Sequence, residues 1–63
     1  MYFHVVVMKK SDFTTYDYRK VDLIQKVADD DVHIREVDPT QPDGYASHNF
    51  NPEYFYIYML GTV

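Results

Sequence analysis

The prediction of the fold depends on residues 14–29, which read TTYDYRKVDLIQKVAD. Apolar side chains recur in this stretch at the spacing of one helix face, and they are Val21, Leu23, Ile24, Val27 and Ala28. The Thr14 hydroxyl is suited to cap the first helical turn, and Asp17 lies where a negative charge favours the helix dipole. The aspartates from residue 29 onward oppose the negative end of that dipole and end the helix. We therefore predict a helix from about residue 15 to residue 29.

Three segments around this helix have the composition and alternation of β-strands. They are residues 2–8 (YFHVVVM), 32–37 (VHIREV) and 53–60 (EYFYIYML). A helical crossover between the first two strands makes them parallel. A single helix covers only one face of the sheet. The predicted fold class is therefore α+β, a small two-layer β-α-β-β domain with a three-stranded mixed sheet, and it forms one compact unit over residues 1–63.

The segment between the last two strands, residues 38–52, has no periodicity and contains all three prolines of the chain. We predict a loop there, and long loops inside compact domains often carry function. Its candidate contact residues are Tyr45, His48 and Phe50.

Alternation in the first and last strands sorts their side chains onto two faces. The apolar set suits the face beneath the helix and consists of Phe3, Val5, Val7, Phe55, Ile57 and Met59. The open face then carries an aromatic patch formed by Tyr2, His4, Tyr54, Tyr56 and Tyr58. Contiguous patches of this kind mark binding surfaces, and Tyr is enriched at interface hot spots. The simpler interpretation is that tyrosines favour strands and tolerate half-exposure without any partner.

Charge is distributed unevenly along the 63 residues, which carry a formal net charge of −4. Residues 1–28 contain five basic and three acidic groups, whereas residues 29–63 contain one basic and seven acidic groups. The acidic balance argues against direct contact with nucleic acid, which requires neutralisation of phosphates. It suits an acidic mimic of nucleic acid instead, with candidate residues Asp29, Asp30, Asp31, Glu36 and Asp38.

The sequence offers little for catalysis or cofactor binding. It has no cysteine, its three histidines lie in three different segments, and its two glycines exclude a glycine-rich phosphate loop. We predict no catalytic residue, no metal site, no cofactor and no enzymatic activity. The absence of cysteine and of an apolar segment of membrane-spanning length favours a cytoplasmic location and no membrane partner.

These observations favour a non-catalytic protein–protein interaction module that uses the tyrosine-rich sheet face. In its compactness, acidity and lack of cysteine the chain resembles, in style rather than in residues, the small accessory proteins with which bacteriophages bind and block host proteins. This resemblance implies a small phage-type inhibitor. Two alternatives stay open: an acidic mimic that occupies a basic groove, and a structural homodimer that makes its contacts through residues 38–52.

Overall fold

The computed structural model describes residues 1–27 and 30–63 and contains five β-strands. The strands are β1 (Phe3–Lys9), β2 (Thr15–Lys26), β3 (Val32–Val37), β4 (Tyr45–Phe50) and β5 (Phe55–Thr62). They form one sheet in the order β4-β3-β2-β1-β5, and all neighbours are antiparallel. The fold is all-β, so the predicted α+β class, the helix and the three-stranded mixed sheet are wrong. The predicted parallel pairing of residues 2–8 with residues 32–37 is also wrong, because β2 lies between β1 and β3 and pairs antiparallel with both.

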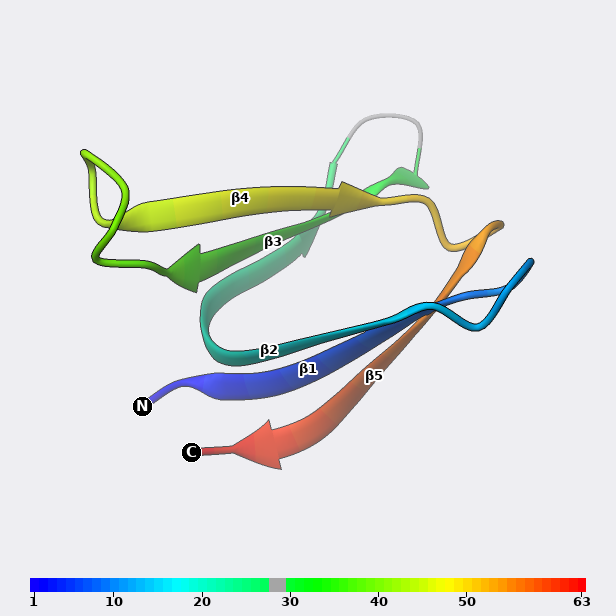
Figure 1. The fold of residues 1–63 in the computed structure, drawn as a ribbon, viewed down its shortest axis with the longest axis horizontal. Helices are drawn as coiled ribbons and strands as arrows, with labels where there is room; N and C mark the ends of the chain where they lie inside the picture. Colours follow the sequence, from blue (N-terminus) through cyan, green and yellow to red (C-terminus); the bar gives the residue numbers. More distant parts are fainter. Residues whose placement is uncertain (28–29) are drawn as a thin grey trace.

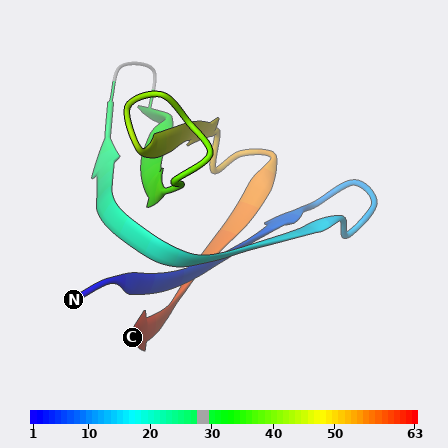
Figure 2. The same ribbon diagram turned by 60° about the vertical axis from the view of Figure 1, so that its left-hand side comes forward.

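The sheet bends so that its two halves face each other (Figure 1). The first part of β2 pairs with β1, and its second part pairs with β3. Figure 2 shows β2 curving from the half that contains β1 and β5 to the half that contains β3 and β4. We call the concave side of this bent sheet the inner face and the convex side the outer face.

The bend explains why β2 has the sequence pattern of a helix. β2 has a β-bulge in each of its two pairings. In the pairing with β1 the bulge lies between Tyr18 and Val21, and in the pairing with β3 it lies between Val21 and Leu23. Each bulge inserts an extra residue, so the inner-face residues Tyr18, Val21 and Ile24 are three apart instead of two. This spacing imitates one face of a helix. The predicted helix would also include Ala28 and Asp29, which lie outside the described residues.

The segment predicted as a loop contains β4. Its six residues alternate between half-buried or buried side chains on the inner face and exposed ones on the outer face. The exposed residues of β4 are mostly polar, and Gly44 precedes the strand at a φ of 82°. A short polar strand flanked by Pro and Gly has the composition of a loop, which is why the sequence pattern conceals it.

The hydrophobic core lies between the two halves of the bent sheet. Its fully or almost fully buried residues are Val5, Val7, Val21, Ile34 and Phe50, and among the described residues no polar or charged side chain is buried with them. The predicted apolar set lies on this inner face, where Val5 pairs with Met59 and Val7 with Ile57, but the prediction that all of it is covered is wrong for Met59, which is 53% exposed. The other half of the sheet covers this face, in place of the predicted helix.

Candidate functional site

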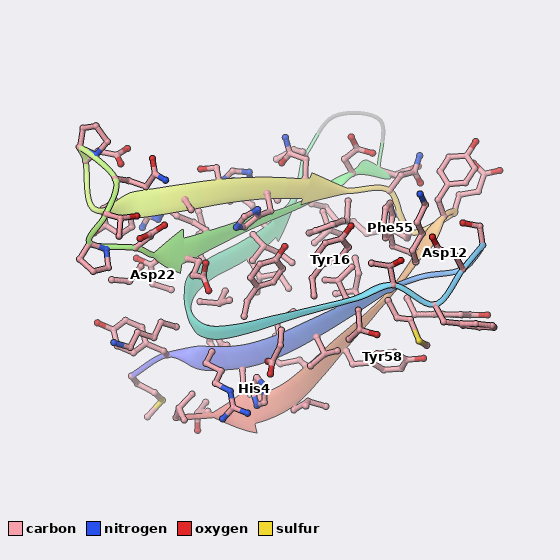
Figure 3. The ribbon with its side chains drawn as sticks, viewed as in Figure 1. His4, Asp12, Tyr16, Asp22, Phe55 and Tyr58 are labelled. Atoms are coloured by element: carbon pink, nitrogen blue, oxygen red, sulfur yellow. The ribbon has the colours of Figure 1, made fainter. Side chains whose placement is uncertain are left out.

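The outer face of β1 and β5 carries two tyrosines side by side. Tyr56 lies opposite Met8 and Tyr58 lies opposite Val6 in the antiparallel pairing. The two tyrosine residues are 44% and 46% exposed, and their ring centroids are 6.2 Å apart. The Lys10 Nζ lies 4.9 Å from the centroid of the Tyr56 ring, a cation–π contact. In Figure 3, Tyr58 lies outside the two halves of the sheet, while Tyr16 and Phe55 lie between them.

The other predicted contact residues are spread along the same strands. His4 is on the outer face, in the row beyond Tyr58, where it pairs with Gly61. Tyr2 lies at the far end of β1, where its backbone exchanges two hydrogen bonds with Val63. Tyr54 precedes β5 and is the most exposed of the predicted tyrosines, at 59%. The structure thus brings Tyr56 and Tyr58 together and places Tyr2, His4 and Tyr54 toward the ends of the two strands.

His4 is engaged with a polar cluster next to the tyrosines. Its Nε2 lies 2.5 Å from Asp17 Oδ1, and Arg19 Nε lies 3.5 Å from Asp17 Oδ2. The hydrogen bond with His4 and the nearby positive charges lower the pKa of the Asp17 carboxyl below its ordinary value. Asp17 therefore stays ionised and fixes the orientation of the His4 ring on the outer face.

β5 exposes apolar side chains beyond the two tyrosines. Met59 and Leu60 are 53% and 61% exposed, although the sequence predicts Met59 on a covered face. β5 is an edge strand, because in the described part of the chain it pairs with β1 alone. On its inner side an open apolar groove of about 490 Å³ is lined by Ile24, Val32, Phe55, Ile57 and Met59, with Lys26 as its charged residue.

The predicted acidic residues do not form one surface. Asp30 and Asp31 lie in the turn that precedes β3, and Asp29 is outside the described residues. Glu36 and Asp38 lie at the opposite end of the same strand. The six residues of β3, at about 3.3 Å each, therefore separate Asp30 and Asp31 from Glu36 and Asp38 by roughly 20 Å. The Asp38 carboxyl accepts hydrogen bonds from the backbone and hydroxyl of Thr40, which lower its pKa.

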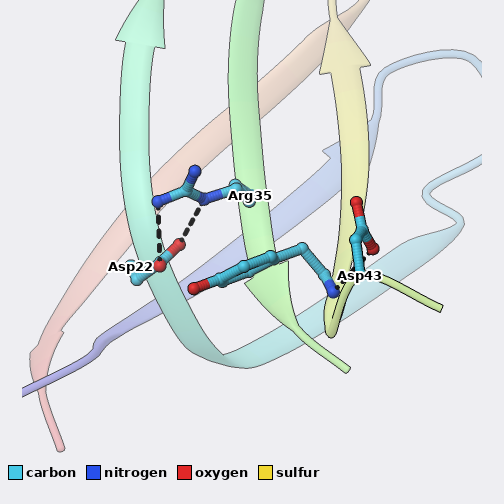
Figure 4. A network of polar contacts seen from close by, with 4 residues as sticks. Asp22, Arg35 and Asp43 are labelled. Carbon is cyan, nitrogen blue, oxygen red and sulfur yellow. Dashed lines mark hydrogen bonds and ion pairs between the residues drawn. The ribbon is translucent and has the colours of Figure 1, made fainter. Parts of the chain in front are cut away.

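The three residues predicted as loop contacts belong to β4 and have structural neighbours. Phe50 is in the core, with its ring edge-on to Phe55 at 5.0 Å. Tyr45 lies on the outer face, with its ring 4.5 Å from the Arg35 guanidinium carbon. Arg35 donates two hydrogen bonds of 3.0 Å to the Asp22 carboxylate, as Figure 4 shows. The prediction of an exposed contact loop is therefore wrong for Phe50.

An aromatic cluster on the inner face was not predicted from the sequence. The His48 ring stacks on Tyr18 at a centroid distance of 4.4 Å, and Tyr18 also stacks on Tyr16 at 6.5 Å. Burial and the nearby charge of Glu36 raise the pKa of the Tyr18 hydroxyl. The buried Nε2 of His48 has no hydrogen-bond partner among residues 1–27 and 30–63, and it lies 3.8 Å from Glu36 Oε1. The alternation of Tyr16 and Tyr18 was the available signal, and the helix assignment concealed it.

Within residues 1–27 and 30–63, no three side chains of His, Cys, Asp or Glu gather as they would around a metal ion. The same residues contain no helix with the length and apolar character that crossing a membrane requires. No protein-family model, curated protein or solved structure matches this chain.

Proposed function

We propose that this chain is a non-catalytic protein-binding module whose contact surface is the outer face of β1 and β5, centred on Tyr56 and Tyr58. One observation carries the proposal: the largest group of exposed apolar side chains among the described residues is on β5. Its outer-face members are Tyr56 and Tyr58, and Leu60 and the inner-face residue Met59 extend the exposed apolar surface around the edge of the strand. Each of these side chains is 44% or more exposed, although the strand that carries them is hydrogen-bonded into the sheet.

The chemistry of this surface suits a protein partner. A tyrosine ring buries a large apolar area while its hydroxyl keeps a polar contact, and it loses few rotamers on binding. Lys10 on one side and the Asp17 cluster on the other supply charges at the rim. Anchors at the centre and charges at the rim form the usual arrangement of a protein interface.

The acidic alternative is less well supported by the positions of the carboxylates. A nucleic-acid mimic needs negative charges in a regular row, whereas Glu36 and Asp38 are one strand length away from Asp30 and Asp31. Glu36 and Asp38 also have local partners in His48 and Thr40. The cytoplasmic location belongs to the proposal too, and the lack of cysteine supports it, since the fold needs no oxidising compartment.

The proposal is tested by capturing partners from an extract of the source cells on immobilised protein at high salt. We expect the wild type and a Tyr45→Ala control to retain the same proteins and the double variant Tyr56→Ala/Tyr58→Ala to lose them. Tyr45 is a suitable control because it is a half-exposed outer-face tyrosine on the opposite edge of the sheet. Each truncated anchor should weaken binding about tenfold or more. Equal capture by the double variant would contradict the proposed surface, and capture only at low salt would favour the acidic mimic.

A further inference from the structure

The hydrogen bonds of β5 show which of its backbone groups face away from β1. The Lys10 amide donates to the Tyr54 carbonyl at 2.9 Å, so these two residues form a hydrogen-bonded pair. Hydrogen-bonded and non-bonded pairs alternate along an antiparallel ladder. Tyr56 and Tyr58 therefore direct their backbone groups toward β1. Ile57 and Met59 direct their N–H and C=O groups to the free edge.

The open part of this edge is short and symmetric. On one side it ends at Phe55, whose N–H donates to the Asn51 carbonyl. On the other side the register of the β1–β5 pairing shifts between His4 and Val5, so the ladder is irregular beyond Met59. Ile57 and Met59 thus each present an N–H and a C=O, and Tyr58 lies midway between them.

Nothing in β5 blocks the addition of another strand. Native proteins protect edge strands with charged residues, prolines or a covering segment. β5 contains no charged residue and no proline, and among the described residues no other strand pairs with its free side. Unpaired amide and carbonyl groups flanked by exposed Tyr58 and Met59 favour pairing with another β-strand.

We propose that β5 pairs with β5 of a second copy of this chain, antiparallel and about a two-fold axis through Tyr58. In this register Ile57 of one copy exchanges both hydrogen bonds with Met59 of the other, and the reverse pair forms by symmetry. The two Tyr58 side chains meet as a non-hydrogen-bonded pair on the outer face, with Cβ atoms about 4.5–5.5 Å apart. The inference deepens the proposed function, on which it rests, because pairing joins the two tyrosine surfaces into one.

A second copy fits this edge because its free backbone groups are self-complementary about Tyr58, and charge does not oppose the pairing. Each chain carries a net charge of −4, which opposes association wherever acidic residues meet. The eight residues of β5 are uncharged, so no like charges face each other across the proposed pair.

The proposal is tested by sedimentation equilibrium of the purified protein from about 1 µM to 1 mM, the range of weak to moderate affinities. We expect the mass to rise from 7.5 kDa toward twice that value, with little dependence on salt. Met59→Pro should abolish dimerisation, because the Pro ring occupies the free edge and removes the N–H that faces the second copy. The variant keeps the β1 hydrogen bonds, since the Met59 backbone does not point toward β1. We expect its dimer dissociation constant to rise at least about 100-fold.

Ser47→Pro is the matched control on the other edge. The Asp38 amide donates to the Gly44 carbonyl, so the alternation along β3 and β4 also directs the N–H of Ser47 to a free edge. This variant should dimerise like the wild type. If Met59→Pro fails to fold by circular dichroism, Met59→Lys replaces it, because it makes two positive charges diagonal neighbours about 7–8 Å apart on the inner face of the pair without changing the backbone.

The outcomes separate this inference from the proposed function. A wild-type chain that stays at 7.5 kDa overturns the inference, and so does a dimer that survives both Met59 variants. If the chain is monomeric and partner capture still requires Tyr56 and Tyr58, the proposed function stands alone. If a Met59-dependent dimer forms but nothing is captured at high salt, the pairing of β5 with β5 is supported and the proposed binding of a foreign protein is contradicted.

Discussion

The two edges of the sheet have opposite characters, although both belong to the same small fold. The outer-face side chains of β4 interact with their neighbours: Tyr45 stacks on Arg35, and Asn49 Oδ1 lies 2.8 Å from His33 Nδ1. β5 makes few such contacts, and its side chains stay largely exposed. Edge strands are normally protected from pairing with other chains. The comparison identifies β4 as a structural edge, and our proposal makes β5 the functional one.

The largest expected effect comes from the inner face of β4. Phe50→Ala removes a core ring that contacts Phe55, Tyr16 and Tyr18, and should destabilise the fold by about 3–5 kcal/mol. A domain of this size has little more stability than that, so we expect the variant to be largely unfolded. Tyr58→Ala, an exposed outer-face change on β5, should cost less than about 1 kcal/mol. Urea unfolding measures both, and similar losses for the two variants would contradict the division into a structural and a functional edge.

A smaller loss is expected when the outer-face contacts near β4 are removed. Arg35→Ala breaks the bidentate hydrogen bonds to Asp22 and the contact with the Tyr45 ring, so Tm should fall by a few degrees. Arg35→Lys should restore only part of the loss, because an ammonium group cannot bind the carboxylate through a planar fork. Self-association through β5 should be unchanged in both variants. A dimer lost with Arg35 would mean that the two edges are coupled.

The same contrast explains which parts of the structure could be predicted from the sequence. β1, β3 and β5 were recognised because their side chains alternate or are β-branched and aromatic, and β3 was predicted residue for residue. β2 was assigned to a helix because its two bulges place Tyr18, Val21 and Ile24 three apart. β4 was missed because its exposed side chains have the polar composition of a loop.

The candidate site shows a similar limit. The shared face of Tyr56 and Tyr58 follows from alternation along one strand, which local sequence contains. The position of β5 at the edge follows from strand order, which depends on pairings between residues more than 50 positions apart, such as Phe3 with Thr62. Neither the free backbone groups of Ile57 nor the exposure of Met59 could be inferred without that order.

Acid should affect the two edges differently. The Arg35 hydrogen bonds lower the pKa of Asp22, so its contribution to stability is fully present above the ordinary value of 3.8 and is lost as pH falls through the depressed value. β5 has no carboxyl side chain and loses no such contribution. The urea concentration at the unfolding midpoint of the wild type should therefore decrease as the pH is lowered from about 3.8. The midpoint of Asp22→Asn should decrease less steeply over the same pH range. Parallel pH profiles for the two proteins would show that the Asp22 pair does not stabilise the β4 side.

The smallest predicted effect concerns the turns that precede β2 and β4. The turn before β4 uses Gly44 at a φ of 82°, a conformation that glycine adopts without strain, whereas the turn before β2 places Phe13 at a φ of 61°. A non-glycine residue in this region is strained by about 1–2 kcal/mol, and the extra freedom of glycine in the unfolded chain offsets part of any gain. Phe13→Gly should therefore stabilise the fold by about 0.5–1 kcal/mol in urea unfolding, and Gly44→Ala should destabilise it by a similar amount. The Phe13 side chain is 67% exposed, so its removal costs little packing. A destabilised Phe13→Gly would mean that the ring makes contacts that outweigh the backbone strain, whereas the expected gain would mean that the strained Phe13 is retained at the expense of stability.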